Sequence, residues 1–394
     1  MKIASWFSSY KQLYQNCSHF IKEDMVNKVK QLYKQADLPD SYNYKLSQAM
    51  QIANIAVQEL GLGNSAVIAI MLFPLVKDKR YTADISADFN VEIATIVRGL
   101  DRIKQLYAKT PSLDTENFRK LLLTLAEDVR VIMIMLSDRL HTMRNLQQKP
   151  EEKRQYIARE TAFLYAPMAH RMGLYKVKTE MEDLSMKYTV PDIYKEIAHK
   201  LSETKQQRDQ YIQQFIEPLR EKLTNVGLRF TIKGRTKSIY SIWNKIKKQN
   251  TTFEGIYDLF AIRVIIDSPI EREKAECWQV YSIVADMYTP NPKRLRDWLS
   301  NPKANGYESL HTTVMGPEGK WVEVQIRTRR MDEVAEKGVA AHWSYKGVDG
   351  NRLNTDTQSV YVFTPTGDLK RLAAGATVLD FAFSIHSDVG CKCV

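Results

Sequence analysis

The spacing of apolar residues changes once along this chain, close to Leu228. From about residue 20 to residue 195, apolar residues recur every three or four positions and glycine and proline are scarce, which is typical of amphipathic helices. From Leu228 onward apolar and polar residues alternate, first over residues 229–234 and most clearly over residues 322–328, which is typical of half-buried strands. The sequence therefore predicts an all-helical half followed by a half built on a β-sheet.

Two segments of the helical pattern predict long helices in different surroundings. Residues 131–136, Val-Ile-Met-Ile-Met-Leu, predict a buried helix that goes on to present Asp138, Arg139 and His141. Residues 192–226 predict one long polar helix that ends at Gly227 and connects the two halves. Its expected apolar stripe consists of Ile197, Leu201, Ile212, Phe215, Ile216, Leu219, Leu223 and Val226.

The clearest strand pattern predicts a β-hairpin with an unusual polar face. Residues 305–314 alternate as well, and Gly-Pro-Glu-Gly at residues 316–319 supplies the turn. On one alignment of the two strands, a single face unites an aromatic ring, a histidine, a carboxylate and an arginine, which are Tyr307, His311, Glu323 and Arg327. An exposed sheet face with scattered polar residues explains the same pattern, so both interpretations stay open on the hairpin alone.

Composition narrows the class of protein. A length of 394 residues predicts two or three domains, and 44% apolar content is ordinary for a folded protein. No apolar run reaches membrane-spanning length and the first residues lack the apolar core of a signal peptide, so we expect a cytoplasmic protein without a membrane partner. Four scattered cysteines predict reduced thiols. The net charge of +11 favours anionic partners such as nucleotides or RNA.

Carboxylates, cations and an aromatic ring in the sheet half predict phosphoryl-type transfer. Asp258, at the mouth of the apolar run over residues 257–267, and Glu323 are the candidate paired carboxylates. The candidate phosphate ligands and the candidate platform for a base are Arg235, Lys237, Ser241, Lys245, Arg263 and Tyr307. The sequence contains no Gly-x-x-x-x-Gly-Lys-Ser/Thr loop, which excludes a P-loop enzyme. Taken singly, each acid also fits a solvated strand end, and each basic cluster fits a solvated face.

Five motifs in the sheet half, in order along the chain, resemble the synthetase domain of the RelA/SpoT family of alarmone enzymes. They occupy residues 234–243, 257–265, 301–313, 322–328 and 335–343. The resemblance implies a nucleotidyltransferase-like mixed sheet that moves pyrophosphate from ATP to the 3′-hydroxyl of GTP or GDP. The products would be AMP and (p)ppGpp, and the expected activity is that of a GTP pyrophosphokinase.

The resemblance also implies roles for individual residues. Asp258 and Glu323 would hold Mg²⁺, and Glu323 would help to deprotonate the 3′-hydroxyl. Arg235 would stack on or clamp ATP, and its phosphates would meet Lys237, Ser241 and Lys245. Tyr307 would stack on guanine, and Asn305 and His311 would orient the acceptor. The remaining candidates for substrate binding are Arg263, Arg296, Lys303, Gln325 and Arg327.

The helical half resembles the family's hydrolase domain in four motifs, at residues 116–121, 127–132, 137–141 and 165–171. That domain removes the 3′-pyrophosphate with Mn²⁺ held by a His, a His-Asp pair and a distant Asp. Asp138 fits the distant Asp, but Phe73 and Pro74 occupy the pair, within a motif in which the family has His-Asp-x-x-Glu-Asp. Lys77 and Asp78 follow, and the earlier His aligns near Gln48 or Ala49.

Loss of these ligands predicts a hydrolase-shaped domain without Mn²⁺ or hydrolase activity, because affinity depends on the number and charge of ligands. Asp138 is expected to pair with Arg139 or Arg144 instead, and the domain to regulate the synthetase through the helix at residues 192–226. One feature conflicts: residues 294–297, Arg-Leu-Arg-Asp, resemble the Arg-x-Lys-Asp version of bifunctional members. Metal ligands outweigh it, since they permit catalysis whereas the charge of this loop modulates it.

The end of the chain resembles the start of the family's TGS domain, a β-grasp fold, most clearly over residues 380–386. We therefore expect domains at residues 1–195 (hydrolase-like, HD-type), 196–346 (synthetase) and 347–394 (linker and truncated TGS domain). The resemblance implies that a longer protein binds the ribosome and deacylated tRNA through this domain and further C-terminal domains. Two other interpretations compete: a catalytically silent nucleotide- or tRNA-sensing regulator, and a bifunctional synthetase/hydrolase.

Overall fold

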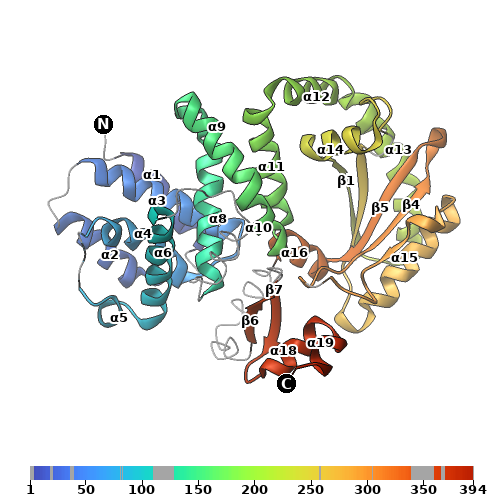
Figure 1. Cartoon of the computed structure of the whole chain (residues 1–394). Coiled ribbons are helices and arrows are strands. Elements are labelled where there is room, and N and C mark those ends of the chain that lie inside the picture. Colours follow the sequence, from blue (N-terminus) through green and yellow to red (C-terminus); the bar gives the residue numbers. More distant parts are fainter. Residues whose placement is uncertain are drawn as a thin grey trace.

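A computed structural model of the chain describes residues 4–17, 21–35, 40–79, 81, 83–109, 128–256, 259–303, 305–338, 359–364 and 369–393. Figure 1 shows a helical half, a half in which helices cover a sheet, and a small C-terminal unit of a hairpin with two helices. The predicted fold class is confirmed, since an all-helical domain precedes a mixed-sheet domain and a small α/β unit follows.

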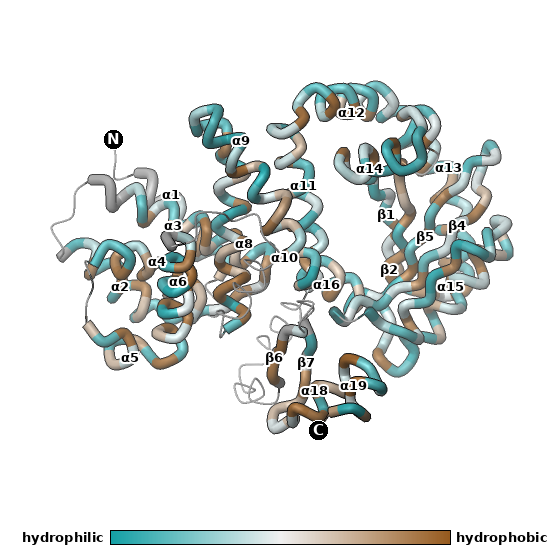
Figure 2. Tube along the Cα trace, viewed as in Figure 1, coloured by the Kyte–Doolittle hydropathy of each residue, from teal (hydrophilic) through white to brown (hydrophobic). Residues whose placement is uncertain are grey.

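The helical half runs from α1 to α11. Its elements are α1 (Ala4–Cys17), α2 (Glu23–Gln35), α3 (Asp40–Gln58), α4 (Asn64–Lys77), α5 (Ile85–Asp88), α6 (Val91–Lys109), α8 (Val129–Arg144), α9 (Glu151–Glu160), a π-helical turn (Thr161–Tyr165), α10 (Ala166–Arg171) and α11 (Tyr175–Thr189). The predicted buried helix is α8, in which Val131, Ile132 and Leu136 are inaccessible to solvent. Residues 66–72 of α4 are all buried as well. The apolar core of this half therefore forms around these two helices, as the brown segments of Figure 2 indicate.

The sheet half contains a five-stranded mixed sheet in the order β1-β2-β5-β4-β3. Its strands are β1 (Phe230–Thr236), β2 (Phe260–Ile266), β3 (Arg296–Asp297), β4 (Leu310–Met315) and β5 (Trp321–Thr328). β2 and β5 are parallel and the other pairs are antiparallel. The predicted hairpin is confirmed as β4 and β5, joined by a turn with a 3-10 segment at Pro317–Gly319. Every residue of β2 is buried, as predicted for an interior strand.

Helices cover the apolar face of this sheet. α13 (Lys205–Asn225) and α15 (Glu273–Met287) pack on it, while α14 (Ile239–Gln249) follows β1 and α16 (Arg329–Lys337) follows β5. Phe215 of α13 is inaccessible to solvent and stacks on Tyr288 with ring centroids 4.4 Å apart. Burial of one such ring contributes about 1.5–3 kcal/mol. Because the apolar side chains face these helices, the alternate residues of each strand emerge on the opposite, polar face.

The prediction of one long connecting helix is wrong. The segment forms two helices, α12 (Pro191–Glu203) and α13, which are separated at Thr204, where ψ is 2°. The Thr204 hydroxyl donates to the Lys200 carbonyl and accepts from Arg208, so local side-chain bonds compete with helix continuation. Packing explains the break, because Ile197 of α12 lies in a core with Ile242 of α14 whereas α13 packs on the sheet. At the end of the expected stripe, Val226 is exposed.

The C-terminal unit contains β6 (Ser359–Phe363) and β7 (Leu369–Ala373), an antiparallel pair, followed by α18 (Val378–Ile385) and α19 (Ser387–Cys391). All four cysteines lie in the described part of the chain and are unpaired, as predicted. Among the described residues, no helix combines the length and the apolar character that crossing a bilayer requires.

Candidate active site on the polar sheet face

The strand register aligns the predicted polar residues in rows across the sheet. One row runs from β1 to β3 through Lys233, Arg263, Gln325, His311 and Arg296, each paired with the next in adjacent strands. Since paired residues project to the same side of a sheet, these side chains share the polar face. Of the four residues predicted to share a face, His311, Glu323 and Arg327 do so, because Glu323 and Arg327 lie two residues on either side of Gln325, which pairs with His311. The alternative interpretation, an exposed sheet face with scattered polar residues, does not describe this face, because its side chains bond to one another.

Glu323 lies at the centre of these contacts. Its carboxylate accepts hydrogen bonds from Lys237 Nζ at 3.0 Å and from Gln325 Nε2 at 2.9 Å, and its Oε1 lies 3.3 Å from His311 Nδ1. Burial alone would raise the pKa of Glu323, but the bond from His311, the charge of Lys237 and the amide of Gln325 hold this pKa well below its usual range. Glu323 is therefore an ionised, half-buried carboxylate at neutral pH.

His311 links this carboxylate to an aromatic cluster. Its Nε2 lies 2.8 Å from the hydroxyl of Tyr307, and its ring packs edge-on against Trp298 at 4.6 Å between centroids. Burial lowers the pKa of His311 more than the neighbouring Glu323 raises it, so the neutral imidazole is favoured. With Nδ1–H directed at Glu323, Nε2 accepts from the Tyr307 hydroxyl. Trp298 was not anticipated from the sequence, although an aromatic residue close to the Asn-Gly-Tyr motif is a signal that could have identified it.

Two of the arginines predicted to bind substrate are already paired with acids of α16. Arg327 is 1% exposed, and its Nε donates to Asp332 at 2.8 Å. Arg263 is 8% exposed and donates to Glu336 at 2.8 Å and to Asp332 at 3.3 Å. Neither acid was expected from the sequence, although their spacing of four places them on one helix face beside the strands. These arginines are consequently held by α16 rather than free in the described structure.

The nucleotide-side candidates gather around the start of α14. Ser238 is its N-cap, and its hydroxyl oxygen accepts from the backbone N–H of Ser241 at 3.2 Å and donates to the Ser241 hydroxyl at 2.9 Å. Lys245 lies one turn further along this helix and is half-buried. Arg235, on β1, is exposed on the same side as Glu323, since it pairs with Ala261, which pairs with Glu323. Cations and hydroxyls thus surround the carboxylate on this side.

Three other predicted residues are placed less directly. Asp258 lies outside the described residues, and the following residue, Leu259, accepts a backbone hydrogen bond from Lys237 at 2.9 Å. Arg296 is exposed and donates to the carbonyls of Lys293 and Leu295 in its own loop. The ammonium of Lys303 lies over the ring of Trp298, 4.3 Å from its centroid.

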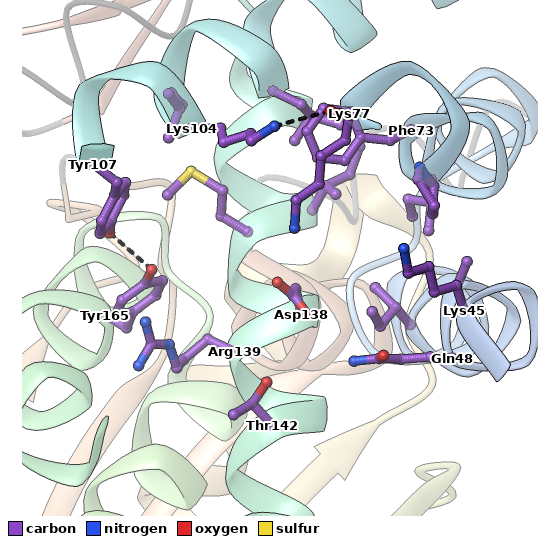
Figure 3. Close-up of a pocket in the computed structure, with 18 of the residues that line it drawn as sticks. Lys45, Gln48, Phe73, Lys77, Lys104, Tyr107, Asp138, Arg139, Thr142 and Tyr165 are labelled. Carbon is purple, nitrogen blue, oxygen red and sulfur yellow. Dashed lines mark hydrogen bonds between the residues drawn. The ribbon is translucent and has the colours of Figure 1, made fainter. Parts of the chain in front are cut away.

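A separate cavity of about 700 Å³ lies within the helical half (Figure 3). All residues assigned to the lost hydrolase site line it, namely Phe73, Pro74, Lys77, Asp78 and Asp138 together with Gln48 and Ala49. The alignment made on the sequence alone therefore brings together residues that meet in space. Lys45 and Asp78 form an ion pair on the wall, and the hydroxyls of Tyr107 and Tyr165 are 2.8 Å apart on the opposite side.

The expected pairing of Asp138 with an arginine is wrong. Arg139 pairs with Glu160 at 2.7 Å, and Arg144 bridges Glu59 and Glu180. Among the described residues, Asp138 has neither a hydrogen bond nor an ion pair, and Figure 3 shows it pointing into the cavity with Lys77 above it. Burial raises the pKa of Asp138, while the charges of Arg139, His141 and Lys77 oppose that rise.

The two sites differ in their fitness for a metal ion. Glu323 suits Mg²⁺, because an ionised carboxylate is the kind of oxygen ligand that this ion prefers. The helical cavity does not suit Mn²⁺: Phe73 and Pro74 offer no ligand atoms, and a lysine charge already acts on Asp138. Within the described part of the chain, no group of three or more His, Cys, Asp or Glu residues is arranged to hold a metal ion.

Models of three different domain families match the helical half, the sheet half and the C-terminal unit of the chain. Residues 26–175 match an HD domain, residues 234–349 match the region found in RelA/SpoT proteins, and residues 360–394 match a TGS domain. A GTP pyrophosphokinase from Myxococcus xanthus is 36% identical over 91% of this chain and 52% of its own length. A guanosine-3′,5′-bis(diphosphate) 3′-pyrophosphohydrolase from Aquifex aeolicus is 36% identical over 86% of this chain and 53% of its own length.

A further relative is the bifunctional (p)ppGpp synthase/hydrolase SpoT of Escherichia coli, which is 33% identical over 98% of this chain and 60% of its own length. The chain thus spans between about half and three fifths of the length of these curated relatives. The relatives carry the names of synthetases, hydrolases and bifunctional enzymes, so their common ground is (p)ppGpp metabolism. With all three domain types matched in the same order, the chain belongs to the RelA/SpoT family.

Proposed function

We propose that this protein is a GTP pyrophosphokinase that transfers the pyrophosphoryl group of ATP to the 3′-hydroxyl of GTP or GDP. The observation that carries the proposal is the polar sheet face, on which an ionised Glu323 is bonded to Lys237, Gln325 and His311 beside the Tyr307 ring. Relatives named GTP pyrophosphokinase support it. Incubation with ATP, GTP and Mg²⁺, followed by separation of the nucleotides, tests it.

In the proposed reaction the 3′-oxygen of the acceptor attacks the β-phosphorus of ATP. The bond between this phosphorus and the oxygen bridging to the α-phosphate breaks, AMP leaves, and Glu323 takes the proton of the 3′-hydroxyl. Lys237 links ATP to the acceptor in this scheme. It is the proposed ligand of the ATP phosphates, and its ammonium is bonded in the described structure to Glu323, the proposed base for the acceptor hydroxyl. Movement of Lys237 toward the ATP phosphates would weaken its hold on the carboxylate and raise the basicity of Glu323.

The remaining residues bind and orient. Arg235, Ser241 and Lys245 would contact ATP from β1 and α14, whereas Arg263 and Arg327 would reach a phosphate only by leaving the acids of α16 that hold them. Glu323, together with Asp258, would hold Mg²⁺. When bound, this ion neutralises part of the charge on the transferred group. In this scheme the neutral His311 orients Glu323 through Nδ1 and the Tyr307 hydroxyl through Nε2.

We further propose that the helical half has no hydrolase activity and instead regulates the synthetase. The cavity supports this, because it retains the shape of a site while Phe73, Pro74 and Lys77 replace groups that a metal needs. The bifunctional alternative requires other ligands, and the described walls of the cavity offer only Asp78, Asp138 and Glu160 as acids. Two of these already pair with Lys45 and Arg139.

A partner of the longer protein is also proposed. The TGS domain, matched at residues 360–394, supports binding of the ribosome and deacylated tRNA by the whole protein. His386, at the end of α18, is exposed in the described structure and thus accessible to a large partner. GTP and GDP are both retained as acceptors, since the residues proposed for the acceptor would contact its base and its ribose.

Replacement of Tyr307 by alanine is expected to weaken binding of the guanine nucleotide far more than binding of ATP. Loss of one base-stacking ring costs about 1–3 kcal/mol, or about tenfold to a hundredfold in Kd. Calorimetric titration of GDP and of a non-hydrolysable ATP analogue measures both affinities on one preparation. Equal losses for the two nucleotides would assign Tyr307 to folding rather than to the acceptor, because its ring is also packed against Trp298.

A further inference from the structure

A tyrosine of the helical half contacts the residues assigned to the guanine acceptor. Tyr175, the first residue of α11, accepts a hydrogen bond from Asn305 Nδ2 on its hydroxyl oxygen, at 2.8 Å. Its ring packs edge-on against the ring of Tyr307, with centroids 5.6 Å apart. The resemblance to the family does not assign Tyr175 to the synthetase site, because this residue belongs to the other half of the chain.

The contact depends on a close approach of two backbones. A Cβ atom on Gly338, which ends α16, would lie 2.4 Å from the carbonyl oxygen of Met172 and 2.8 Å from the carbonyl carbon of Gly173. Both glycines have positive φ, 59° at Gly338 and 74° at Gly173, a region that side chains disfavour. The turn between α10 and α11 is therefore seated directly against the sheet half, and Tyr175 follows it by two residues.

α11 is anchored a second time further along. The carboxylate of Asp183 accepts the backbone N–H of Tyr240 at 2.8 Å, at the N-terminus of α14. Since α14 also carries Ser241 and Lys245, one helix of the helical half touches both the acceptor side and the ATP side of the candidate site. Two contacts of this kind, separated by eight residues, indicate a formed interface rather than a chance approach of one side chain.

The space beside the Tyr307 ring is filled in this arrangement. Tyr307 is 8% exposed, although a base that stacks on it needs a free ring face. The ammonium of Lys303 lies 4.9 Å from its centroid and 5.8 Å from that of Tyr175, so the cation lies beside the rings of Tyr175, Tyr307 and Trp298. Cation–π attraction and the bond to Asn305 stabilise this filled state.

We propose that Tyr175 controls access of the guanine nucleotide to the synthetase site by competing for Tyr307 and Asn305. The inference rests on the proposed function of Tyr307 and Asn305 as acceptor ligands. A base that stacks on Tyr307 must displace the Tyr175 edge and the Lys303 ammonium, and a nucleotide that uses the Asn305 amide must replace the Tyr175 hydroxyl. Affinity for the acceptor is then reduced by the fraction of molecules in which α11 is docked.

Equilibrium titration of GDP, with the ATP analogue titrated in parallel, tests this step on the intact chain. Tyr175→Ala removes the ring and the hydroxyl and is expected to lower the Kd for GDP by about fivefold to tenfold, with the Kd for the ATP analogue unchanged. Tyr175→Phe removes only the hydroxyl and is expected to lower it by about threefold. The matched control is Tyr44→Ala, an exposed tyrosine on α3 of the same half, which should leave both values unchanged.

Several outcomes overturn the proposal. An unchanged or raised Kd for GDP in folded Tyr175→Phe would contradict it, and this conservative variant keeps the test valid if Tyr175→Ala unfolds. Failure of every variant to bind GDP would also contradict it. Synthesis of (p)ppGpp by wild type with no effect of Tyr175 would refute only this inference. Tighter GDP binding by both variants without any (p)ppGpp formation would refute only the proposed function.

Discussion

Glu323→Gln is expected to lower the rate of (p)ppGpp formation by about three orders of magnitude while the protein stays folded. Glutamine has the same shape but cannot accept the proton of the 3′-hydroxyl and is a poor metal ligand. Charge stabilisation worth several kcal/mol is lost with the carboxylate, and each 1.36 kcal/mol corresponds to about a tenfold change in rate. Initial rates of AMP and (p)ppGpp formation under saturating nucleotides measure this effect.

The same hairpin offers a matched control. Glu318 lies in the turn, where its exposed carboxylate pairs with Lys320, so Glu318→Gln makes an identical chemical change away from the polar face. We expect the activity of this control to stay within about twofold of wild type, since exposed ion pairs contribute at most about 1 kcal/mol to stability. Turnover by Glu323→Gln that approaches wild type would remove Glu323 from catalysis. Asp258→Asn carries the same expectation from the sequence.

Release of pyrophosphate from ppGpp in the presence of Mn²⁺ is expected to be undetectable for the wild-type chain. Hydrolysis through the helical cavity requires a metal held by several ligands, and of the assigned positions only Asp78 and Asp138 retain a carboxylate. Asp78 is paired with Lys45, and the charge of Lys77 acts on Asp138. Like charges repel, so a divalent cation would have to bind beside the positively charged lysines that line the cavity.

Restoration of two ligands is not expected to restore the activity. The double variant Phe73→His, Pro74→Asp still lacks the earlier histidine, where Gln48 and Ala49 stand, and still contains Lys77. Radiolabelled ppGpp separated after incubation with Mn²⁺ measures hydrolysis, with a hydrolase relative as the positive control. Manganese-dependent hydrolysis by the wild-type chain above the background of a chelated sample would contradict the account of this cavity.

The polar face of the sheet could be predicted from local sequence, for a physical reason. Alternation of Val322, Val324 and Ile326 with Glu323 and Gln325 fixes which side chains share a face, because a strand has a period of two. A tight turn at residues 316–319 then fixes the register of the hairpin, which pairs His311 with Gln325. Residues whose positions depend on a single pair of strands could therefore be predicted from the sequence.

Features that depend on packing between segments distant in the sequence could not be predicted in this way. The acids Asp332 and Glu336 meet Arg263 and Arg327 only because α16 folds back beside the sheet. Similarly, the break at Thr204 follows from the different surfaces on which α12 and α13 pack, and a helical periodicity continues across it. Asp138 was assigned an arginine partner because of proximity in sequence, but Arg139 points to Glu160 on another helix. Tyr175 reaches Asn305 across 130 residues of chain.

The product assay on the unmodified chain tests the central claim most directly. The protein is incubated with ATP, GTP and Mg²⁺, and the nucleotides are resolved by ion-exchange chromatography at several times. We predict that AMP and pppGpp accumulate in equal amounts, that GDP in place of GTP yields ppGpp, and that omission of the guanine nucleotide prevents AMP formation. Absence of pppGpp from a folded sample that binds both nucleotides would contradict the claim, as would AMP formation that does not depend on the acceptor.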